Sequence, residues 1–196
     1  MKIYLASKSP RRKALLAQMG VEFDVLAVDT PEEQIPGETA ELYSQRVTQE
    51  KLDAAWVKML DDKLEIRPIL CADTEVVVDG RVLGKPLNYQ EAFNTLKAYS
   101  DRSHVVITSV GVKFLNFEKI VSHQTDVYFA AMNDSDIHHY LAMGDYQDKA
   151  GSYGIQSYIG QFIARIDGCF FSVMGLPLNT VRALLAELAL KNTNEK

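Results

Sequence analysis

Cysteine is scarce in this 196-residue chain: only Cys71 and Cys169 occur, each inside an apolar run. Two isolated thiols exclude a disulfide-rich scaffold, and their spacing matches no metal-binding pattern. The chain also lacks an excess of positive charge, because 21 Lys and Arg stand against 26 Asp and Glu, for a net charge of −5. This balance excludes a nucleic-acid binder held by bulk positive potential, so the basic residues must act locally.

Long apolar runs are also missing. No stretch is long enough to cross a membrane, and the apolar part of "MKIYLASKSP" is too short for a signal peptide. With so little cysteine, the chain is expected to be a cytoplasmic protein in a reducing compartment. Its length suits one domain, residues 1–196, or two tightly fused lobes, and no repeat or linker divides it.

Strand and helix patterns alternate along the chain. Strands are predicted at 2–6, 21–28, 68–78, 104–115 and 119–132. Helices are predicted at 10–19, about 39–60, 88–100 (capped by Asn88), 133–144 and 176–191. Hairpin turns are expected at Asp79-Gly80, around Asn116 and at Asp167-Gly168. The mixture predicts an α/β fold, a sheet of mixed strand direction with flanking helices.

The helix at 10–19 begins with an unusual charge pattern. Ser9 is a good N-cap and Pro10 suits the first helical position. Arg11 and Arg12 then stand in a first turn that favours acids. Free backbone N–H groups beside two guanidinium groups would make a phosphate site. The alternative is a pair of solvated arginines on a surface helix.

The run "PILCADT" places an acid directly after apolar residues. Asp73, followed by Thr74, is costly to bury without a cation or a hydrogen-bond partner. A carboxylate at the end of a central strand commonly holds a metal ion or activates water. The alternative is a strand-end Asp that bonds its own backbone.

Other charged residues are ambiguous by themselves. Glu32 and its neighbour Glu33 fall in a polar loop, where carboxylates are usually solvated, and Lys51 falls on the long helix, where lysine is usually at the surface. Lys85, between a glycine and a proline, has a restricted backbone. The segment "GRVLGKP" lacks the P-loop spacing, and Pro86 stands where Ser or Thr is needed. A P-loop NTPase is therefore disfavoured.

The segment "DKAGSYGIQ" is rich in glycine. Gly151 and Gly154 would allow the backbone to approach a ligand closely. Gln156 offers both a donor and an acceptor for a base edge. Tyr153 could stack on that base, although a packing role is the commoner one. The four histidines form no catalytic motif, so nucleophilic catalysis by a side chain is not supported.

In their order along the chain, "LASKSPRRKALL", "PEEQIP", "EKLDAA", "CADTEVVVDG", "LGKP", "DKAGSYGIQ" and "VMGLPL" resemble the Maf family of nucleoside triphosphate pyrophosphatases. The resemblance covers about residues 3–186. It implies an elongated fold related to that of inosine triphosphate pyrophosphatases, with two lobes around a central cleft. It also implies cleavage of a nucleoside triphosphate to the monophosphate and pyrophosphate, dependent on Mg²⁺ or Mn²⁺.

The resemblance also implies roles for individual residues. Ser7, Arg11 and Arg12 fall in a phosphate-binding opening segment, and Asp73 matches the proposed proton acceptor. The other matching functional positions are Glu32, Lys51, Lys85 and Gln156. Glu32 and Asp73 would hold the divalent metal, which prefers oxygen ligands. Whether Asp73 acts as a base or as a metal ligand stays open, and so does the role of Glu75, where an apolar residue is usual.

Three positions distinguish two branches of the family. The branch that prefers 7-methyl-GTP typically has Trp in place of Arg11, Ser-Asp-Gln in place of Ala72-Asp73-Thr74, and Glu in place of Gln156. This chain resembles the dTTP/UTP branch at all three. A neutral amide suits the O4 and N3–H edge of thymine or uracil, whereas a carboxylate suits the donor face of guanine.

Two other classes of function stay open. One is a non-catalytic nucleotide sensor, and the other is a regulator of cell division, which the family's link with inhibition of septum formation suggests. Direct nucleic-acid binding is not expected, because the chain is acidic and has no stripe of alternating basic and aromatic residues. The expected ligand is a small nucleotide, with Thr74 among its contacts. A homodimer through apolar strand edges is also expected, whereas binding to a membrane is not.

Overall fold

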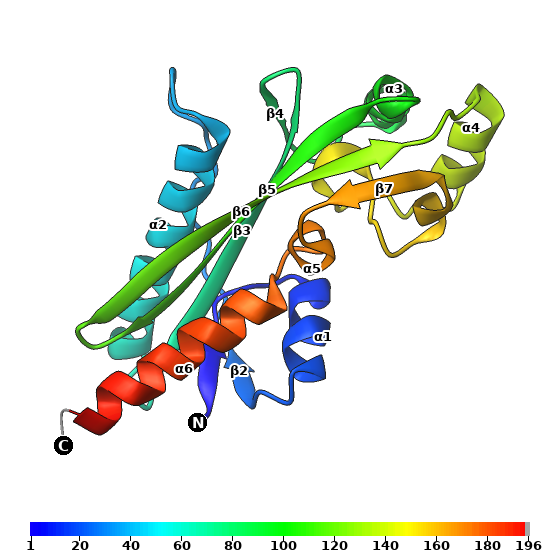
Figure 1. Cartoon of the computed structure of the whole chain (residues 1–196). Helices are drawn as coiled ribbons and strands as arrows, with labels where there is room; N and C mark the ends of the chain where they lie inside the picture. The colour runs from blue at the N-terminus through cyan, green and yellow to red at the C-terminus, as the bar shows by residue number, and fades with distance from the viewer. Residues whose placement is uncertain (195–196) are drawn as a thin grey trace. The chain divides into compact units, whose positions relative to one another are not determined.

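The computed structural model describes residues 1–194, and the side chains of residues 1–191 (Figure 1). Its strands are β1 (Ile3–Leu5), β2 (Phe23–Val25), β3 (Ile69–Val78), β4 (Arg81–Leu83), β5 (Ser103–Phe114), β6 (Phe117–Phe129) and β7 (Ile163–Asp167). Its α-helices are α1 (Pro10–Gln18), α2 (Ala40–Asp61), α3 (Tyr89–Tyr99), α4 (Asp134–Ala142), α5 (Phe170–Val173) and α6 (Leu178–Asn194). Two 3₁₀ turns, η1 (Ala150–Ser152) and η2 (Tyr158–Phe162), complete the described elements.

The strands form a sheet of mixed direction. Their order is β2-β1-β3-β5-β6-β7, and β4 pairs with β3 beside this path. The β1 strand is parallel to both β2 and β3, whereas β3 with β4 and β6 with β7 are antiparallel. The predicted α/β fold with a mixed sheet and flanking helices is confirmed.

The chain divides into two compact units. The first unit contains residues 1–73, 108–122 and 175–196, and the second contains residues 74–107 and 123–174. The long strands β3, β5 and β6 each run from one unit into the other. The elongated shape, the central cleft and the description of residues 1–196 as one domain stay predictions.

The core of the first unit lies between α2 and the strands. Leu52, Ala55 and Met59 of α2 pack with Tyr4, Ala6, Ile69 and Cys71. Two apolar side chains of this helix, Leu42 and Val57, are 56% and 55% exposed. The helix instead buries the face of Val47, which also carries Ser44, Thr48 and Lys51.

The core of the second unit is rich in aromatic rings. Tyr99, at the end of α3, stacks on His104 of β5 with 4.2 Å between ring centroids. Phe129 and Tyr153 pack against the same pair of rings. Around them lie apolar side chains of α3, α4 and β6, and α3 and α4 lie against one another (Figure 1).

Local turn and cap signals were mostly right. Asp79 and Gly80 both have positive φ, 48° and 77°, in the turn between β3 and β4, as an Asp-Gly hairpin requires. The side chains of Ser9 and Asn88 cap α1 and α3 as predicted. The polar end of the chain, residues 192–196, would be expected to fray. The α6 helix instead continues to Asn194, and residues 195–196 lie outside the described part.

The hairpin predicted at Asp167-Gly168 was wrong, because the short helix α5 comes after β7 instead of a return strand. Gly168 has a φ of 136°, and a Cβ there would lie 2.6 Å from Oγ1 of Thr125. The same Thr125 hydroxyl accepts the Cys169 amide at 3.0 Å and bonds the Ser172 hydroxyl at 2.9 Å. These contacts hold the chain against β6 and direct it into a helical turn.

Stability is expected to fall on acidification through His104. Burial lowers the pKa of His104 from its ordinary 6.5 to about 4. Between these values the unfolded chain binds a proton that the folded chain does not, so the free energy of unfolding falls as the pH drops from about 6.5 to about 4. Between pH 7 and pH 5 the loss from this one group is about 2 kcal/mol. Urea unfolding of the wild type and of His104→Gln at pH 7 and pH 5 measures it.

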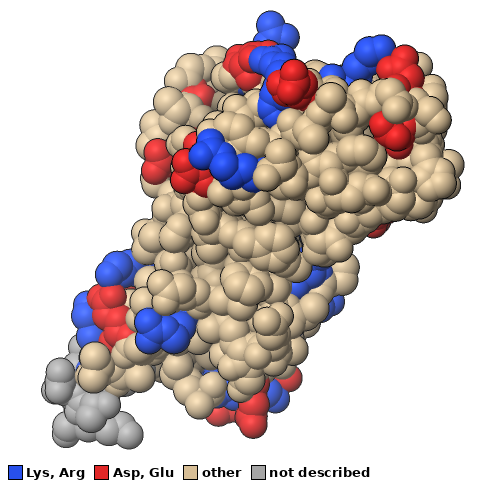
Figure 2. Space-filling model, turned by 45° about the vertical axis from the view of Figure 1, so that its right-hand side comes forward, with Lys and Arg blue, Asp and Glu red and all other residues tan. Residues whose placement is uncertain are grey.

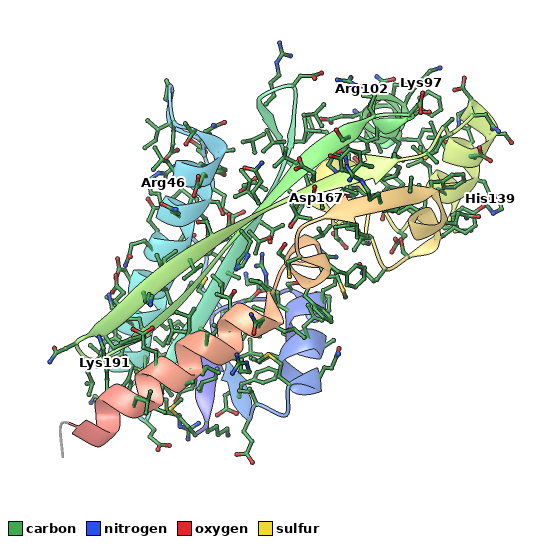
Figure 3. The ribbon with its side chains drawn as sticks, viewed as in Figure 1. Arg46, Lys97, Arg102, His139, Asp167 and Lys191 are labelled. Atoms are coloured by element: carbon green, nitrogen blue, oxygen red, sulfur yellow. The ribbon has the colours of Figure 1, made fainter. Side chains whose placement is uncertain are left out.

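The free energy of unfolding of His104→Gln should depend less on pH between 7 and 5 than that of the wild type. His139→Gln provides the control, because His139 is exposed on α4 (Figure 3). An equal pH dependence of the wild type and of His104→Gln would contradict the prediction.

Candidate functional site

A lysine lies between two acids in the first unit. Nζ of Lys51, on α2, is 2.7 Å from Oδ1 of Asp73 on β3 and 2.5 Å from Oε1 of Glu32 in the loop before α2. The side chains of Lys51 and Asp73 are only 11% and 8% exposed, whereas that of Glu32 is 55% exposed. The cluster therefore has a buried side, formed by the helix and the strand, and a solvent-accessible side.

This burial corrects two predictions. Lys51 is not on the surface, because α2 turns the face with Thr48 and Leu52 toward the core. Asp73 is not at a strand end, because it is the fifth of the ten residues of β3. A mid-strand position also rules out the alternative of a strand-end turn.

The charges of the cluster compensate one another. Burial by itself would lower the pKa of Lys51, but the carboxylates of Asp73 and Glu32 outweigh it, and the pKa is raised above its ordinary value. Lys51 is therefore a fixed positive charge. The Oδ1 atom of Asp73 accepts its hydrogen bond, but the buried Oδ2 atom has no hydrogen-bond partner among the described residues.

These residues fit a divalent cation only if a bound phosphate supplies further oxygen ligands. The described residues include no group of three or more His, Cys, Asp or Glu arranged to hold a metal. Mg²⁺, however, is commonly bound by one or two carboxylates together with phosphate oxygens and water. Glu32 and the unpartnered Oδ2 of Asp73 supply such a donor set, which fits a cation that is completed by a phosphate ligand.

The loop that carries Glu32 is attached to α2 by an arginine. Arg46, labelled in Figure 3, donates to the carbonyl of Glu33 at 2.9 Å. It also bonds the carboxylates of Glu38 at 2.8 Å and Glu50 at 2.9 Å. Because Glu32 precedes Glu33, this attachment restricts where the Glu32 carboxylate can lie relative to Lys51.

The opening segment brings Ser7 and Arg12 together at the start of α1. The Ser9 hydroxyl accepts the Arg12 amide, and the Ser7 hydroxyl accepts the Ser9 amide at 3.2 Å. Nε of Arg12 donates to the carbonyl of Gly175 at 2.8 Å, and its guanidinium also reaches the Ser7 hydroxyl at 3.5 Å. The alternative of a freely solvated arginine is therefore wrong for Arg12, while Arg11 is half-buried on the same turn.

The remaining predicted site residues lie in the second unit. Lys85 is exposed two residues after the end of β4, and Gln156 is exposed just after the buried stretch 151–155. Thr74 is half-buried beside Asp73 on β3. Glu75 is only 8% exposed, so the alternative of a solvated strand residue is wrong for it.

The glycine-rich segment does not have the open backbone expected of it. A Cβ at Gly151 would lie 2.8 Å from the Tyr99 hydroxyl, and one at Gly154 would lie 2.8 Å from Cε of Lys149. These glycines permit tight packing within the protein rather than the close approach of a ligand. Tyr153 is 6% exposed and packs in the aromatic core, which is the commoner role noted from the sequence.

Sequence reasoning missed the residues that support the site. Gly175 and Arg46 hold site segments through long-range contacts that have no local signal. The burial of Lys51 did have a local sequence signal, because one face of the helix repeats at helical spacing. That face carries Val47, Thr48, Lys51, Leu52 and Ala55. The signal was missed because two residues of that face, Thr48 and Lys51, are polar.

The fold and the cluster define an α/β protein whose site suits a cation and an anionic ligand rather than a nucleophilic side chain. The model of the family described as "Maf-like protein" matches residues 2–188, and the chain belongs to this family.

Curated relatives cover nearly all of the chain. It is 42% identical over 186 residues to the dTTP/UTP pyrophosphatase of Chromobacterium violaceum, covering 95% of this chain and 94% of that protein. It is 44% identical over 180 residues to the dTTP/UTP pyrophosphatase of Photobacterium profundum, covering 91% and 92%.

Among solved structures, the Staphylococcus aureus Ham1 protein is similar with a TM-score of 0.40 and 14% identity, over 66% of this chain and 72% of that one. Of the helices in the described part of the chain, none combines the length and the apolar character needed to cross a membrane.

Proposed function

We propose that this protein hydrolyses dTTP and UTP, and related modified pyrimidine triphosphates, to the nucleoside monophosphate and pyrophosphate. Relatives named dTTP/UTP pyrophosphatase, 36–44% identical over more than nine tenths of the chain, support the substrate class. The observation that carries the reaction is the buried Asp73 carboxylate, which is bonded to Lys51 through one oxygen and has its other oxygen unpartnered.

The chain's own residues then have distinct tasks. Oδ2 of Asp73 accepts the proton of the water that attacks the α-phosphorus, while Lys51 holds Oδ1 and offsets the buried negative charge. Arg11, Arg12 and Lys85 neutralise part of the roughly four negative charges of a triphosphate, and the Ser7 hydroxyl bonds a phosphate oxygen. Gln156 pairs with the pyrimidine edge, and Thr74 contacts the substrate beside Asp73.

Glu32 and Asp73 would hold the divalent cation, Mg²⁺ or Mn²⁺. When bound, this cation offsets the charge of the phosphate oxygens and favours departure of pyrophosphate. The two tasks suggested for position 73, proton acceptor and metal ligand, compete for the unpartnered Oδ2 oxygen, and both need an ionised carboxylate. The amide of asparagine supplies neither.

A nucleic-acid partner is not part of this proposal. The net charge is −5, and on the face shown in Figure 2 basic and acidic side chains lie next to one another without a broad basic patch. The partners proposed are a nucleotide and, through apolar strand edges, a second copy of the chain. The proposed compartment is the cytoplasm, where the buried thiol of Cys71 stays reduced; burial raises its pKa to about 12.

The test is a panel of purified nucleotides with Mg²⁺, scored separately for pyrophosphate and orthophosphate. dTTP and UTP should give pyrophosphate in amounts equal to the monophosphate, and no orthophosphate. Tight binding of dTTP without any product would instead indicate a nucleotide sensor. Faster cleavage of 7-methyl-GTP than of dTTP would place the chain in the other branch of the family.

Base preference should depend on Gln156. In Gln156→Glu the carboxylate cannot donate to O4 of thymine or uracil, so kcat/KM for UTP is expected to fall at least tenfold, because a lost hydrogen bond also leaves a polar partner unpaired. Adding Arg11→Trp should raise the relative rate with 7-methyl-GTP. Comparing kcat/KM for UTP and 7-methyl-GTP measures both effects, with Gln161→Glu on η2 as the control. An unchanged ratio in the double variant would contradict the assignment of these positions.

A further inference from the structure

A hydrogen bond between two loops lies next to two of the proposed substrate-binding residues. The Gly151 amide donates to the Gly84 carbonyl, with 3.1 Å between nitrogen and oxygen. Lys85 comes directly after Gly84 in the chain, and Gln156 lies five residues after Gly151. The bond therefore joins the segment that presents a cation for phosphate to the segment that presents an amide for the base.

The backbone conformation of Gly151 and the space around it are tightly constrained. Its φ is 68°, and a Cβ there would lie 2.8 Å from the Tyr99 hydroxyl oxygen and from both methyl carbons of Val76. Its amide bonds Gly84, and its carbonyl accepts the Tyr99 hydroxyl at 3.0 Å. A shift of Gly151 toward Tyr99 or Val76 is therefore blocked, and a shift away from Tyr99 breaks the bond to its hydroxyl.

Tyr99 is itself firmly anchored. It is the last residue of α3, is 1% exposed, and stacks on the His104 ring. Nε2 of His104 is 2.8 Å from the hydroxyl of Tyr153, two residues after Gly151. The aromatic core thus holds the glycine-rich segment at two successive points.

We propose that Tyr99 is a positioning residue: through Gly151 it fixes the Lys85 and Gln156 segments relative to each other and sets the preference for UTP over CTP. The second part rests on the proposed function, in which Gln156 reads the base. An amide has both a donor and an acceptor, so after rotation it can pair with cytosine as well as with uracil. The preference between the two bases then depends on how firmly the segment is held.

The experiment uses Tyr99→Phe, which removes the hydroxyl and keeps the ring that stacks on His104. Amide hydrogen exchange should become about fivefold faster in both segments, residues 82–87 and 149–157, because the lost Tyr99 hydroxyl bond loosens Gly151, whose amide bonds the Gly84 carbonyl. KM for UTP should rise about fivefold with kcat within about twofold, and the ratio of kcat/KM for UTP to that for CTP should fall about fivefold.

The control is Tyr146→Phe, at another buried tyrosine of the same core, whose ring lies edge-on to Tyr89. It should change neither the exchange of the two segments nor the UTP/CTP ratio. Faster exchange in 149–157 alone, or an unchanged ratio in Tyr99→Phe, would overturn the proposal. If the wild type cleaves neither nucleotide, the proposed function fails, but hydrogen exchange still decides whether Tyr99 links the two segments.

Discussion

Turnover of dTTP is expected to fall about 10²–10⁴-fold when Asp73 is replaced by asparagine, the range typical for loss of a general base. The Asp73 carboxylate has one buried oxygen bonded to Lys51 and one without a partner among the described residues. The amide oxygen of asparagine can still accept the Lys51 hydrogen bond. It cannot take a proton from water, however, and it binds a divalent cation weakly.

The fold of the Asp73→Asn variant should therefore survive, which allows its kinetics to be interpreted. Circular dichroism and urea unfolding check this, and rates are normalised to the folded fraction. The matched control is Asp53→Asn, because Asp53 also pairs with a lysine, Lys113, but is half exposed. Turnover of the control should stay within about twofold of the wild type. A folded Asp73→Asn variant with nearly normal turnover would refute the role given to this carboxylate.

The features predicted correctly from the sequence depend on neighbours within a few residues. The Ser9 and Asn88 caps bond amides three residues later, and the Asp79-Gly80 turn needs only two residues with positive φ. Such caps and turns are determined by residues that are close together in the sequence. The local sequence at Asp167-Gly168 was misleading, because Thr125, more than forty residues earlier, determines the path of the chain after that glycine.

The roles given to the site residues stay predictions, but the structure shows where these residues lie. The order of the motifs indicated Glu32, Lys51 and Asp73, and the structure places both acids within hydrogen-bond distance of the lysine. The burial of Lys51 was missed, because its helix has apolar residues on both faces and the buried face also carries polar residues. The link between Gly84 and Gly151 could not be predicted, since nothing in either segment indicates its partner.

Replacing Lys51 by methionine is expected to lower the free energy of unfolding by about 3 kcal/mol. Methionine fills the space of the lysine stem, so the effect reports the charge. Without the ammonium, the carboxylate of Asp73 stays buried with no opposite charge beside it, and Glu32 adds a like charge nearby. Removing one partner of a buried ion pair typically costs this much. Urea unfolding at pH 7.5 in EDTA measures the loss.

Lys113→Met is the control for Lys51→Met. The Lys113 ammonium also lies between two carboxylates, those of Asp53 and Glu118, but these acids are 51% and 36% exposed. Exposed pairs contribute little because water screens them, so this variant should lose less than about 1 kcal/mol. A similar loss in both variants would show that burial does not distinguish the two clusters.

Adding Mg²⁺ to the Lys51→Met variant should restore part of the lost stability. The two acids left behind by the lysine are the proposed metal ligands, and a cation that binds the folded state alone stabilises it by mass action. At a concentration ten times its dissociation constant the gain is about 1.4 kcal/mol. Urea unfolding with and without Mg²⁺ should show a larger gain for Lys51→Met than for Lys113→Met or for the double variant Lys51→Met/Glu32→Gln. Equal gains in all three would mean that Glu32 and Asp73 do not form the cation site.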